Sequence, residues 1–227
     1  MIRSGASIGL FALVFGCAQT AFAVEPELAK INDGTRWRLV NGDATSASDK
    51  GQTVARLKPK ADASTPSNVG MALVEGVDFG EGALEVDLQG QGDERVFLGL
   101  AFNAGDGQHF EAVYFRPFNF TRAGTQDGQA FRSHAVQYVA WPEHTWEKLR
   151  AASPLKYEAP VAPIPDSRGW FHARVEVGKS TVRVFVDGAK QPSLVVERLA
   201  HGKGRVGLWV DGHDAAFRNF KILPSAK

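Results

Sequence analysis

Planar and hydrogen-bonding side chains are concentrated between His109 and Glu158. Two hydrophobic segments in this region, HFEAVYFRPFNF and AVQYV, are separated and followed by long polar loops that are rich in aromatic residues. Such side chains suit a polar, ring-containing ligand, because amides and guanidinium groups hydrogen-bond hydroxyls while aromatic planes pack on rings. The candidate ligand-binding residues are Arg116, Asn119, His134, Gln137, Tyr138, Trp141, His144, Tyr157 and Glu158.

Four aromatic residues of this region could stack on the apolar C–H faces of sugar rings. They are Trp141, Trp146, Tyr138 and Tyr157. The alternative is that they belong to the hydrophobic core, which is the prediction for Trp170 and Trp209 because both lie in strand-like segments. The sequence leaves both interpretations open for the first four residues.

Arg116 lies at the end of a predicted strand, because Pro117 has no N–H to donate to a sheet ladder. We expect its guanidinium group at the rim of the sheet, where five donors in a planar fork suit vicinal hydroxyls or a uronic-acid carboxylate. The alternative is a structural ion pair with Glu158 or Asp127 that pins the long loops.

His134 and Glu158 are candidates for general acid–base chemistry if the fold brings them together as base and acid. A single histidine in a loop can equally be a surface residue that forms hydrogen bonds. The histidines show no i, i+4 pair with a catalytic glutamate between them, so the sequence predicts no metal site.

Hydrophobic periodicity predicts many short strands. ALEVDLQ alternates apolar and polar residues, as in a half-buried strand, and VFLGLAF is apolar throughout, as in a strand covered on both faces. A loop rich in Gly, Ser and Asp is expected after Val40, and a turn at 66–70. The expected strands are 35–40, 53–57, 83–89, 96–102, 109–116, 135–139, 170–177, 181–186, 194–196, 205–210 and 216–222, and the one expected helix is 142–152.

These elements predict an all-β protein, a two-sheet antiparallel sandwich with one short helix in a long loop. We expect residues 24–227 to form one domain, which is a usual size for a sandwich.

Residues 1–23 resemble a secretory signal peptide, with Arg3 before an apolar segment and Ala21-Phe22-Ala23 as the cleavage site. The apolar segment is too short to cross a bilayer, which takes roughly 20 residues. Lipoprotein processing at Cys17 is the alternative to cleavage after Ala23. We therefore predict a periplasmic or secreted protein without a membrane span.

Cleavage after Ala23 would remove Arg3, one of 26 Lys and Arg residues, so that the basic residues would match the 25 acidic ones. With no excess of positive charge, we expect no nucleic-acid partner. Cleavage would also remove the only cysteine, so neither a disulfide nor a zinc site with thiolate ligands is expected.

The C-terminal part resembles a known family. WFHARVEVGKSTVRVFVDGAKQPSLVV and GRVGLWVDGHDAAFRNFKI are similar to the closing strands of the concanavalin A-like lectin and glucanase superfamily, in particular of bacterial 3-keto-disaccharide hydrolase or family-16 glycoside hydrolase-like domains. The resemblance implies a jelly-roll sandwich. It says less about activity, because this fold carries lectins, adhesins, hydrolases and lyases.

The same resemblance draws attention to Glu85-Val86-Asp87-Leu88-Gln89-Gly90, which is similar to the catalytic motif of laminarinases. Glycine stands where that motif has its acid glutamate, and a retaining glycosidase needs two carboxyl groups roughly 5 to 5.5 Å apart. A strand with a solvated acidic face is the alternative. The weak catalytic candidates are therefore Glu85, Asp87, Glu111, His134 and Glu158.

No cofactor is expected. The resemblance to this superfamily would allow a structural calcium ion near Asp211 and Asp214 or in the loop that carries Asp106, although no loop has a recognisable calcium spacing. The leading hypothesis is a domain that binds a carbohydrate through residues 114–158. A glycoside hydrolase or related sugar-cleaving enzyme is the alternative, and a structural envelope protein is the second alternative; the glycan and the oligomeric state stay open.

Overall fold

The computed structural model describes residues 22–60, 69–90, 95–121, 130–200 and 202–225. Most of the expected signal peptide, including Cys17, lies outside these residues, and so does Asp127. None of the helices in the described ranges is long and apolar enough to cross a membrane.

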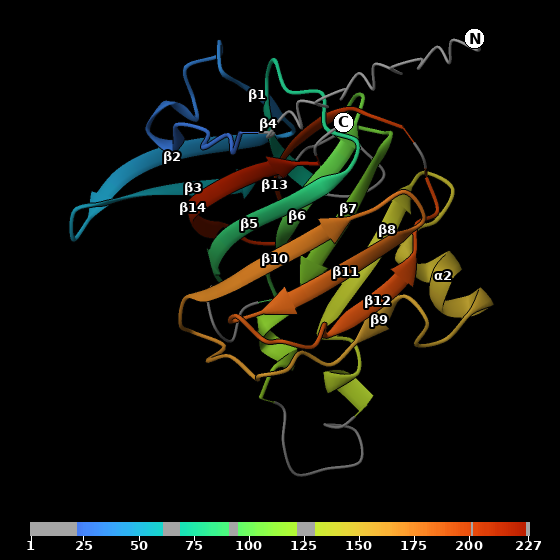
Figure 1. Cartoon of the computed structure of the whole chain (residues 1–227). Coiled ribbons are helices and arrows are strands. Elements are labelled where there is room, and N and C mark those ends of the chain that lie inside the picture. Colours follow the sequence, from blue (N-terminus) through green and yellow to red (C-terminus); the bar gives the residue numbers. More distant parts are fainter. Residues whose placement is uncertain (1–21, 61–68, 91–94, 122–129, 201, 226–227) are drawn as a thin grey trace, which may run out of the picture.

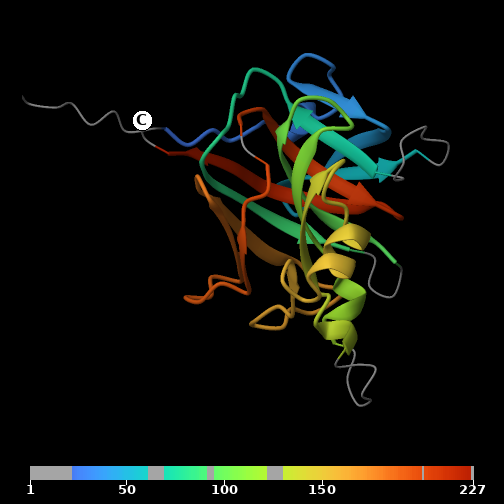
Figure 2. The same ribbon diagram turned by 90° about the vertical axis from the view of Figure 1, so that its right-hand side faces the viewer.

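Two seven-stranded antiparallel sheets face each other in the described part of the chain (Figures 1 and 2). The β7 sheet has the order β1 (Trp37–Val40), β4 (Val69–Val74), β13 (Arg205–Asp211), β6 (Phe97–Ala104), β7 (Phe110–Phe115), β8 (Val136–Trp141) and β9 (Glu158–Ala159). The β5 sheet has the order β12 (Leu194–Glu197), β11 (Thr181–Val186), β10 (Phe171–Val177), β5 (Gly82–Gln89), β14 (Ala215–Pro224), β3 (Gln52–Pro59) and β2 (Gly42–Asp49). The predicted all-β, two-sheet antiparallel sandwich is confirmed.

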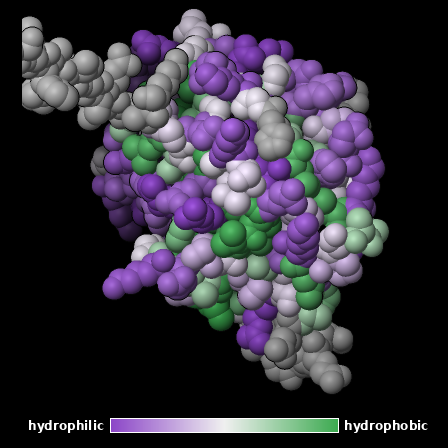
Figure 3. All heavy atoms as spheres, turned by 45° about the vertical axis from the view of Figure 1, so that its right-hand side comes forward, coloured by the Kyte–Doolittle hydropathy of each residue, from purple (hydrophilic) through white to green (hydrophobic). Residues whose placement is uncertain are grey.

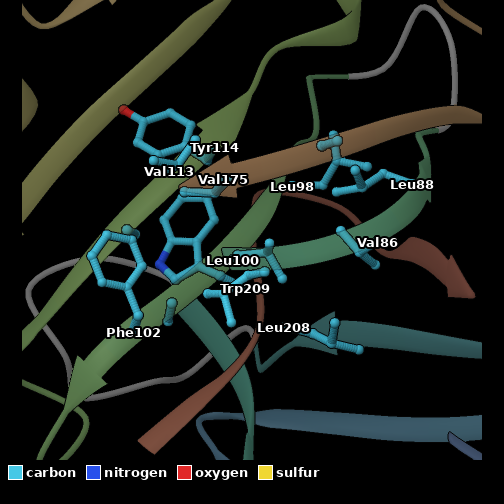
Figure 4. Close-up of a cluster of buried hydrophobic side chains, with 14 of the residues drawn as sticks. Val86, Leu88, Leu98, Leu100, Phe102, Val113, Tyr114, Val175, Leu208 and Trp209 are labelled. Atoms are coloured by element: carbon cyan, nitrogen blue, oxygen red, sulfur yellow. The ribbon is translucent and has the colours of Figure 1, made fainter. Parts of the chain in front are cut away.

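Strand alternation places the core between the sheets. On β5, Leu84, Val86 and Leu88 are fully buried, whereas the intervening Glu85 and Asp87 are partly exposed. The close-up of the core shows Val86 and Leu88 of this strand together with side chains of the β7 sheet such as Leu98 and Leu208 (Figure 4). Each fully buried leucine or valine contributes about 1.5 to 3 kcal/mol, so this face determines which side of the strand lies inward.

The strand β7 is buried on both faces, and its direction determines where polar residues can reach solvent. Phe115 packs edge-on against Phe171 of the β5 sheet, with 5.2 Å between ring centroids, so it points into the core. Because strand side chains alternate, Tyr114 lies on the outer face of the β7 sheet. Gln137 is its register partner on β8 and shares that face.

One predicted loop is a strand, and the end of one predicted turn belongs to a strand. Gly42–Asp49 was expected to be a polar loop, but it pairs along its whole length with β3 as the edge strand β2, and Lys50 and Gly51, both at positive φ, make the turn. Of the predicted turn at 66–70, residues 66–68 lie outside the described part of the chain, and residues 69 and 70 belong to β4 instead. An edge strand needs apolar residues on one face only. In β2 the inward positions carry small residues, so the sequence shows no clear apolar alternation.

The predicted helix is confirmed but shorter than expected. It begins at Trp146, with Thr145 as its N-cap, and ends at Ala152 (α2). Residues 142–145 turn back on β8, since the backbone groups of His144 and Ala140 hydrogen-bond each other at 2.7 and 3.1 Å. Pro142 therefore lies in this turn and not in the first turn of the helix.

Candidate functional site

A pocket of about 290 Å³ opens on the outer face of the β7 sheet. Its lining comes from the ends of β6, β7 and β13, from the 3-10 helix η2 (Pro117–Asn119), from residues before β8 and from α2. The lining residues are Arg95, Phe97, Tyr114, Arg116, Phe118, Asn119, Phe131, His134, Trp146, Arg150 and Asp211. The pocket thus draws together segments that are far apart in the sequence.

Two aromatic side chains of the β7 sheet, Phe97 and Tyr114, line the pocket. Tyr114 on β7 and Trp209 on β13 stack with 4.6 Å between their ring centroids. Gly99 lies between them on β6 and is the register partner of both. Since glycine has no side chain, the two rings meet above the intervening strand, and Phe97 adds an edge-on contact with Tyr114 at 6.0 Å.

Arg116 lies beneath this pocket and is only 5% exposed, so the expectation of a guanidinium group at an open rim is wrong. It donates from Nη1 to the His134 carbonyl (2.7 Å), and from Nη2 to the Tyr114 hydroxyl (3.0 Å) and to Gln137 Oε1 (3.3 Å). The strand does end before Pro117, as predicted, but the guanidinium group is buried, and the His134 carbonyl is one of its contacts. Its carbon lies 5.0 Å from the Tyr114 ring centroid, close enough for a cation–π contact.

Glu158 lies behind the pocket and is held by Arg150 of α2. Arg150 donates from Nε to Oε1 (2.9 Å) and from Nη2 to Oε2 (2.6 Å), a two-point contact typical of Arg–carboxylate pairs. His134 Nδ1 lies 2.8 Å from Glu158 Oε2 without the alignment of a hydrogen bond. The sequence candidates His134 and Glu158 do meet, but the carboxylate is buried and engaged with an arginine.

Asn119 places an unsatisfied acceptor at the pocket. The residue is 3% exposed, its Nδ2 donates weakly to the His134 carbonyl at 3.5 Å, and its buried Oδ1 has no hydrogen-bond partner in the described part of the chain. Leaving such a group unpaired costs about 1 to 3 kcal/mol, so a ligand hydroxyl that donates to Oδ1 would recover this energy.

Asp211 is the carboxyl group among the pocket-lining residues. Burial raises the pKa of Asp211, and only a backbone hydrogen bond from Gly212 opposes this shift. Burial likewise raises the pKa of Tyr114 to about 12, so its hydroxyl stays protonated and can donate while it accepts from Arg116.

Trp146 forms the exposed edge of the pocket. It is 39% exposed, which excludes the core interpretation for this residue, and the Arg150 guanidinium lies 4.8 Å from its ring centroid. Phe118 packs edge-on against Phe97 at 5.4 Å. An indole plane open to solvent beside hydrogen-bonding groups can stack on a sugar ring.

Other predicted ligand-binding residues lie elsewhere. Tyr138 and Tyr157 are buried and pack near each other at 6.2 Å, away from the pocket. Trp141 stacks on Phe110 at 6.2 Å, and His144 belongs to the turn after β8. Gln137 supports the site from below, because its Oε1 accepts from Arg116.

Trp170 was predicted to belong to the core together with Trp209. Trp209 is buried, but Trp170 is partly exposed on the β5 sheet, with the Arg218 guanidinium 4.3 Å from its ring centroid.

Glu111, a weak catalytic candidate, is completely buried at one end of the sandwich. Its carboxylate accepts hydrogen bonds from Arg198 Nη2 (2.9 Å), from the Tyr138 hydroxyl (2.7 Å) and from Asn103 Nδ2 (3.1 Å). A carboxylate with all its acceptors filled by protein groups joins elements and has no free oxygen for a substrate.

Glu85 and Asp87 lie on the β5 sheet, away from the pocket. Glu85 pairs with Arg174, and Asp87 accepts from His172 (2.8 Å), Arg218 (3.1 Å) and Asn219 (2.8 Å). Burial acts to raise the pKa of Asp87, but these hydrogen bonds outweigh it and the pKa is lowered. The motif that resembles a laminarinase centre therefore forms ion pairs on a strand surface.

The family resemblance would allow a calcium ion near Asp211 and Asp214 or in the loop that carries Asp106. The described residues contain no group of three His, Cys, Asp or Glu side chains that could hold a metal ion. Asp106 Oδ1 instead accepts the backbone N–H groups of Gln108 and His109, both at 2.7 Å, and so closes its own loop.

The sequence interpretation missed several pocket residues, namely Arg95, Phe97, Tyr114 and Phe118. Phe97 and Tyr114 lie in hydrophobic segments that predict core strands. A strand covered on both faces has no polar alternation to show which side chains point outward.

No protein-family model matches the sequence, and no curated protein matches it. Solved structures do match. A carbohydrate-binding module, CBM66, from Bacillus subtilis superposes with a TM-score of 0.52 at 15% identity, over 82% of this chain and 95% of that chain.

Two further structures match similarly. A Bacillus subtilis protein of unknown function with a galectin-like fold has a TM-score of 0.54 at 14% identity, over 91% of this chain and 96% of that chain. A Bacillus licheniformis beta-glucanase has a TM-score of 0.54 at 13% identity, over 91% and 98%. The chain therefore has the concanavalin A-like lectin/glucanase fold, as the resemblance of its C-terminal strands implied.

Proposed function

We propose that this protein binds a carbohydrate in the pocket on the outer face of the β7 sheet and does not cleave it. The observation that carries the proposal is the combination, in one pocket, of the exposed Trp146 ring with the unpartnered Asn119 Oδ1. An aromatic plane packs on a sugar ring, and a buried acceptor orients one hydroxyl. The carbohydrate-binding module and the beta-glucanase of the same fold support a sugar ligand.

The carboxyl groups favour binding over hydrolysis. Glycosidases place two carboxyl groups on either side of the scissile bond, roughly 5 to 9.5 Å apart. Asp211 is the carboxyl group in the lining of this pocket, whereas Glu158 is 3% exposed and held by Arg150. One available carboxyl group can orient a sugar but cannot serve as both acid and nucleophile.

A hydrolase remains the second candidate because of Asp211 itself, since a raised pKa is typical of a catalytic acid. Release of reducing ends from a polysaccharide by the wild type, and its loss in Asp211→Asn, would establish hydrolysis and overturn the proposal of binding alone.

The proposal includes export of the protein. Residues 1–23 carry the features of a signal peptide, and a glycan-binding domain in the periplasm or outside the cell would meet polysaccharides there. The mass of the purified native protein tests this: cleavage after Ala23 would leave Val24 as the first residue.

The binding test is a glycan array with the folded protein, followed by calorimetry with the best ligand for the wild type and for Trp146→Ala. We expect Trp146→Ala to weaken binding about tenfold or more, which is about 1.4 kcal/mol, because a stacking surface is lost. The thermal unfolding midpoint should change little, since the ring is 39% exposed.

Trp170→Ala is the matched control, because Trp170 is another partly exposed tryptophan but lies on the β5 sheet. It should leave sugar binding unchanged. If the folded wild type is retained by no plant or bacterial polysaccharide, or if Trp146→Ala binds as well as the wild type, the proposed site is wrong.

A further inference from the structure

The pocket carries more positive than negative charge. Three arginines line it, Arg95, Arg116 and Arg150, against the single carboxyl group of Asp211. Glu158 lies behind the lining and neutralises Arg150 through two hydrogen bonds at 2.6 and 2.9 Å. The guanidinium groups of Arg95 and Arg116 therefore remain against the one carboxyl group of Asp211. Burial disfavours the charged form of Asp211.

Arg116 forms an ion pair with Glu158, the alternative that the sequence left open, but it shares this carboxylate with Arg150. Its three hydrogen bonds go to neutral acceptors, a carbonyl, a phenol and an amide. The Glu158 Oε2 atom lies 4.0 Å from Nη1, beyond hydrogen-bond distance, and that oxygen already accepts from Arg150. A cation that is 5% exposed and shares one carboxylate with a second arginine is compensated only in part, so an anion in the pocket would stabilise it.

Arg95 supplies a second cation at the mouth of the pocket. The residue is exposed, and its guanidinium has no hydrogen bond or ion pair with any described residue. A free arginine on a long side chain can turn toward a bound anion and offer two parallel N–H donors to it.

Neutral groups beside these charges match the rest of a sugar acid. The Tyr114 hydroxyl accepts from Arg116 and keeps its own proton to donate to a ligand oxygen. The Asn119 Oδ1 atom is a buried acceptor for a ligand hydroxyl. A uronic acid presents a carboxylate and hydroxyl groups on the same ring, which is the pattern that these donors and the acceptor require.

We propose that the carbohydrate bound in this pocket is anionic, with a carboxylate group, as in a uronic acid, placed between Arg95 and Arg116. This inference rests on the proposed function, because it names the class of sugar that the same pocket selects. A sulfated sugar shares the negative charge, and the test separates it from a uronic acid.

The experiment is calorimetry on the purified protein with three oligosaccharides of equal length: a galacturonide, the neutral galactoside, and a sulfated galactoside. We expect the galacturonide to bind at least tenfold more tightly than the galactoside. Its binding should weaken as sodium chloride rises from about 50 to 500 mM, because salt screens exposed charges. If the sulfated galactoside also binds tightly, the pocket selects anionic sugars by their charge and does not distinguish a carboxylate from a sulfate.

Two variants with opposite expected effects test the placement of the carboxylate. Arg95→Gln should weaken galacturonide binding about three- to tenfold and galactoside binding by a smaller factor. Asp211→Asn, which keeps an acceptor oxygen but removes the competing negative charge, should strengthen galacturonide binding. Arg38→Gln is the matched control, because Arg38 is exposed on β1 and lies outside the pocket.

The outcomes separate this inference from the proposed function. Equal affinity for the acidic and neutral sugars, or an Arg95→Gln variant that binds both like the wild type, overturns the anionic preference and leaves sugar binding intact. No binding of any glycan by the folded protein overturns the proposed function and this inference with it.

Discussion

Arg116 shows how one residue can serve both the fold and the site. It joins β7 to the backbone of His134 and to β8 through Gln137 while its face lies against the Tyr114 ring. We predict that Arg116→Ala lowers the free energy of unfolding by about 2 to 4 kcal/mol, because several buried acceptors lose their donor. Urea denaturation measures this loss.

Arg116→Lys is the informative companion variant. It keeps the charge but not the planar fork, so it should restore only part of the stability. If Arg116→Ala unfolds at the same urea concentration as the wild type while losing its ligand, Arg116 acts in binding alone and the structural role argued above is wrong.

The sequence predicted part of the site because the signal was local. Pro117 marked the end of β7, and the polar residues on either side of it, Arg116, Asn119 and His134, do lie at one pocket. Tyr138 and Tyr157 were placed there by their proximity in sequence, but strand alternation turns Tyr138 inward, and Tyr157, which precedes β9, is buried close to it. Only long-range strand pairing determines which face of a fully buried strand is the outer one.

At the scale of elements, His172 and Asp87 connect β10 with β5, and Arg218 and Asn219 of β14 meet the same carboxylate. The hydrogen bond to Asp87 is the main cause that raises the pKa of His172 above 6.5. The stabilisation from this pair is therefore fully present below about pH 6.5 and is lost as the pH rises through the higher folded-state pKa.

We predict that the thermal unfolding midpoint of the wild type falls, relative to that of His172→Gln, as the pH is raised from about 6.5 through this higher value. The reason is that only the wild type carries the His172 proton, which the folded state loses in this range. Differential scanning calorimetry at several pH values measures the difference. Parallel curves for the two proteins would contradict the linkage.

Strands were easiest to predict where one face is apolar and the other polar, as in ALEVDLQ, which is β5. The edge strand β2 was missed because its sequence, GDATSASD, has the composition of a loop and owes its conformation to pairing with β3. Pairing with β3 therefore outweighs the low strand propensity of this sequence.

At the scale of the whole molecule, Glu111 and Arg198 join the two sheets. Glu111 is on β7, and Arg198, which follows β12, also donates to the carbonyls of Gly80 (2.9 Å) and Gly178 (3.3 Å). We predict that Glu111→Gln lowers the free energy of unfolding by about 3 to 5 kcal/mol, because it leaves the Arg198 charge buried without a counter-ion. Chemical denaturation measures this change.

The double variant Glu111→Gln/Arg198→Met should recover much of that loss, since it removes both charges. Glu85→Gln is the surface control and should cost about 1 kcal/mol or less, because Glu85 and Arg174 form a partly exposed pair. A Glu111→Gln protein as stable as the wild type would contradict the role of this pair in joining the sheets.

The surface mixes hydrophilic and hydrophobic areas in the view of Figure 3. Large exposed apolar residues include Trp146, Leu155, Ile164 and Val195, and of these Trp146 lines the pocket.

The beginning and the end of the described chain are paired. The backbone groups of Val24 and Ile222 exchange two hydrogen bonds of 2.8 Å, and η2, which contributes to the pocket, lies at the opposite end of the molecule (Figures 1 and 2). A molecule tethered by either terminus would therefore hold its pocket outward, away from the support. If the pocket binds a glycan as proposed, several copies tethered in this way would bind one long polysaccharide at many points. The avidity would then exceed the affinity of any single pocket.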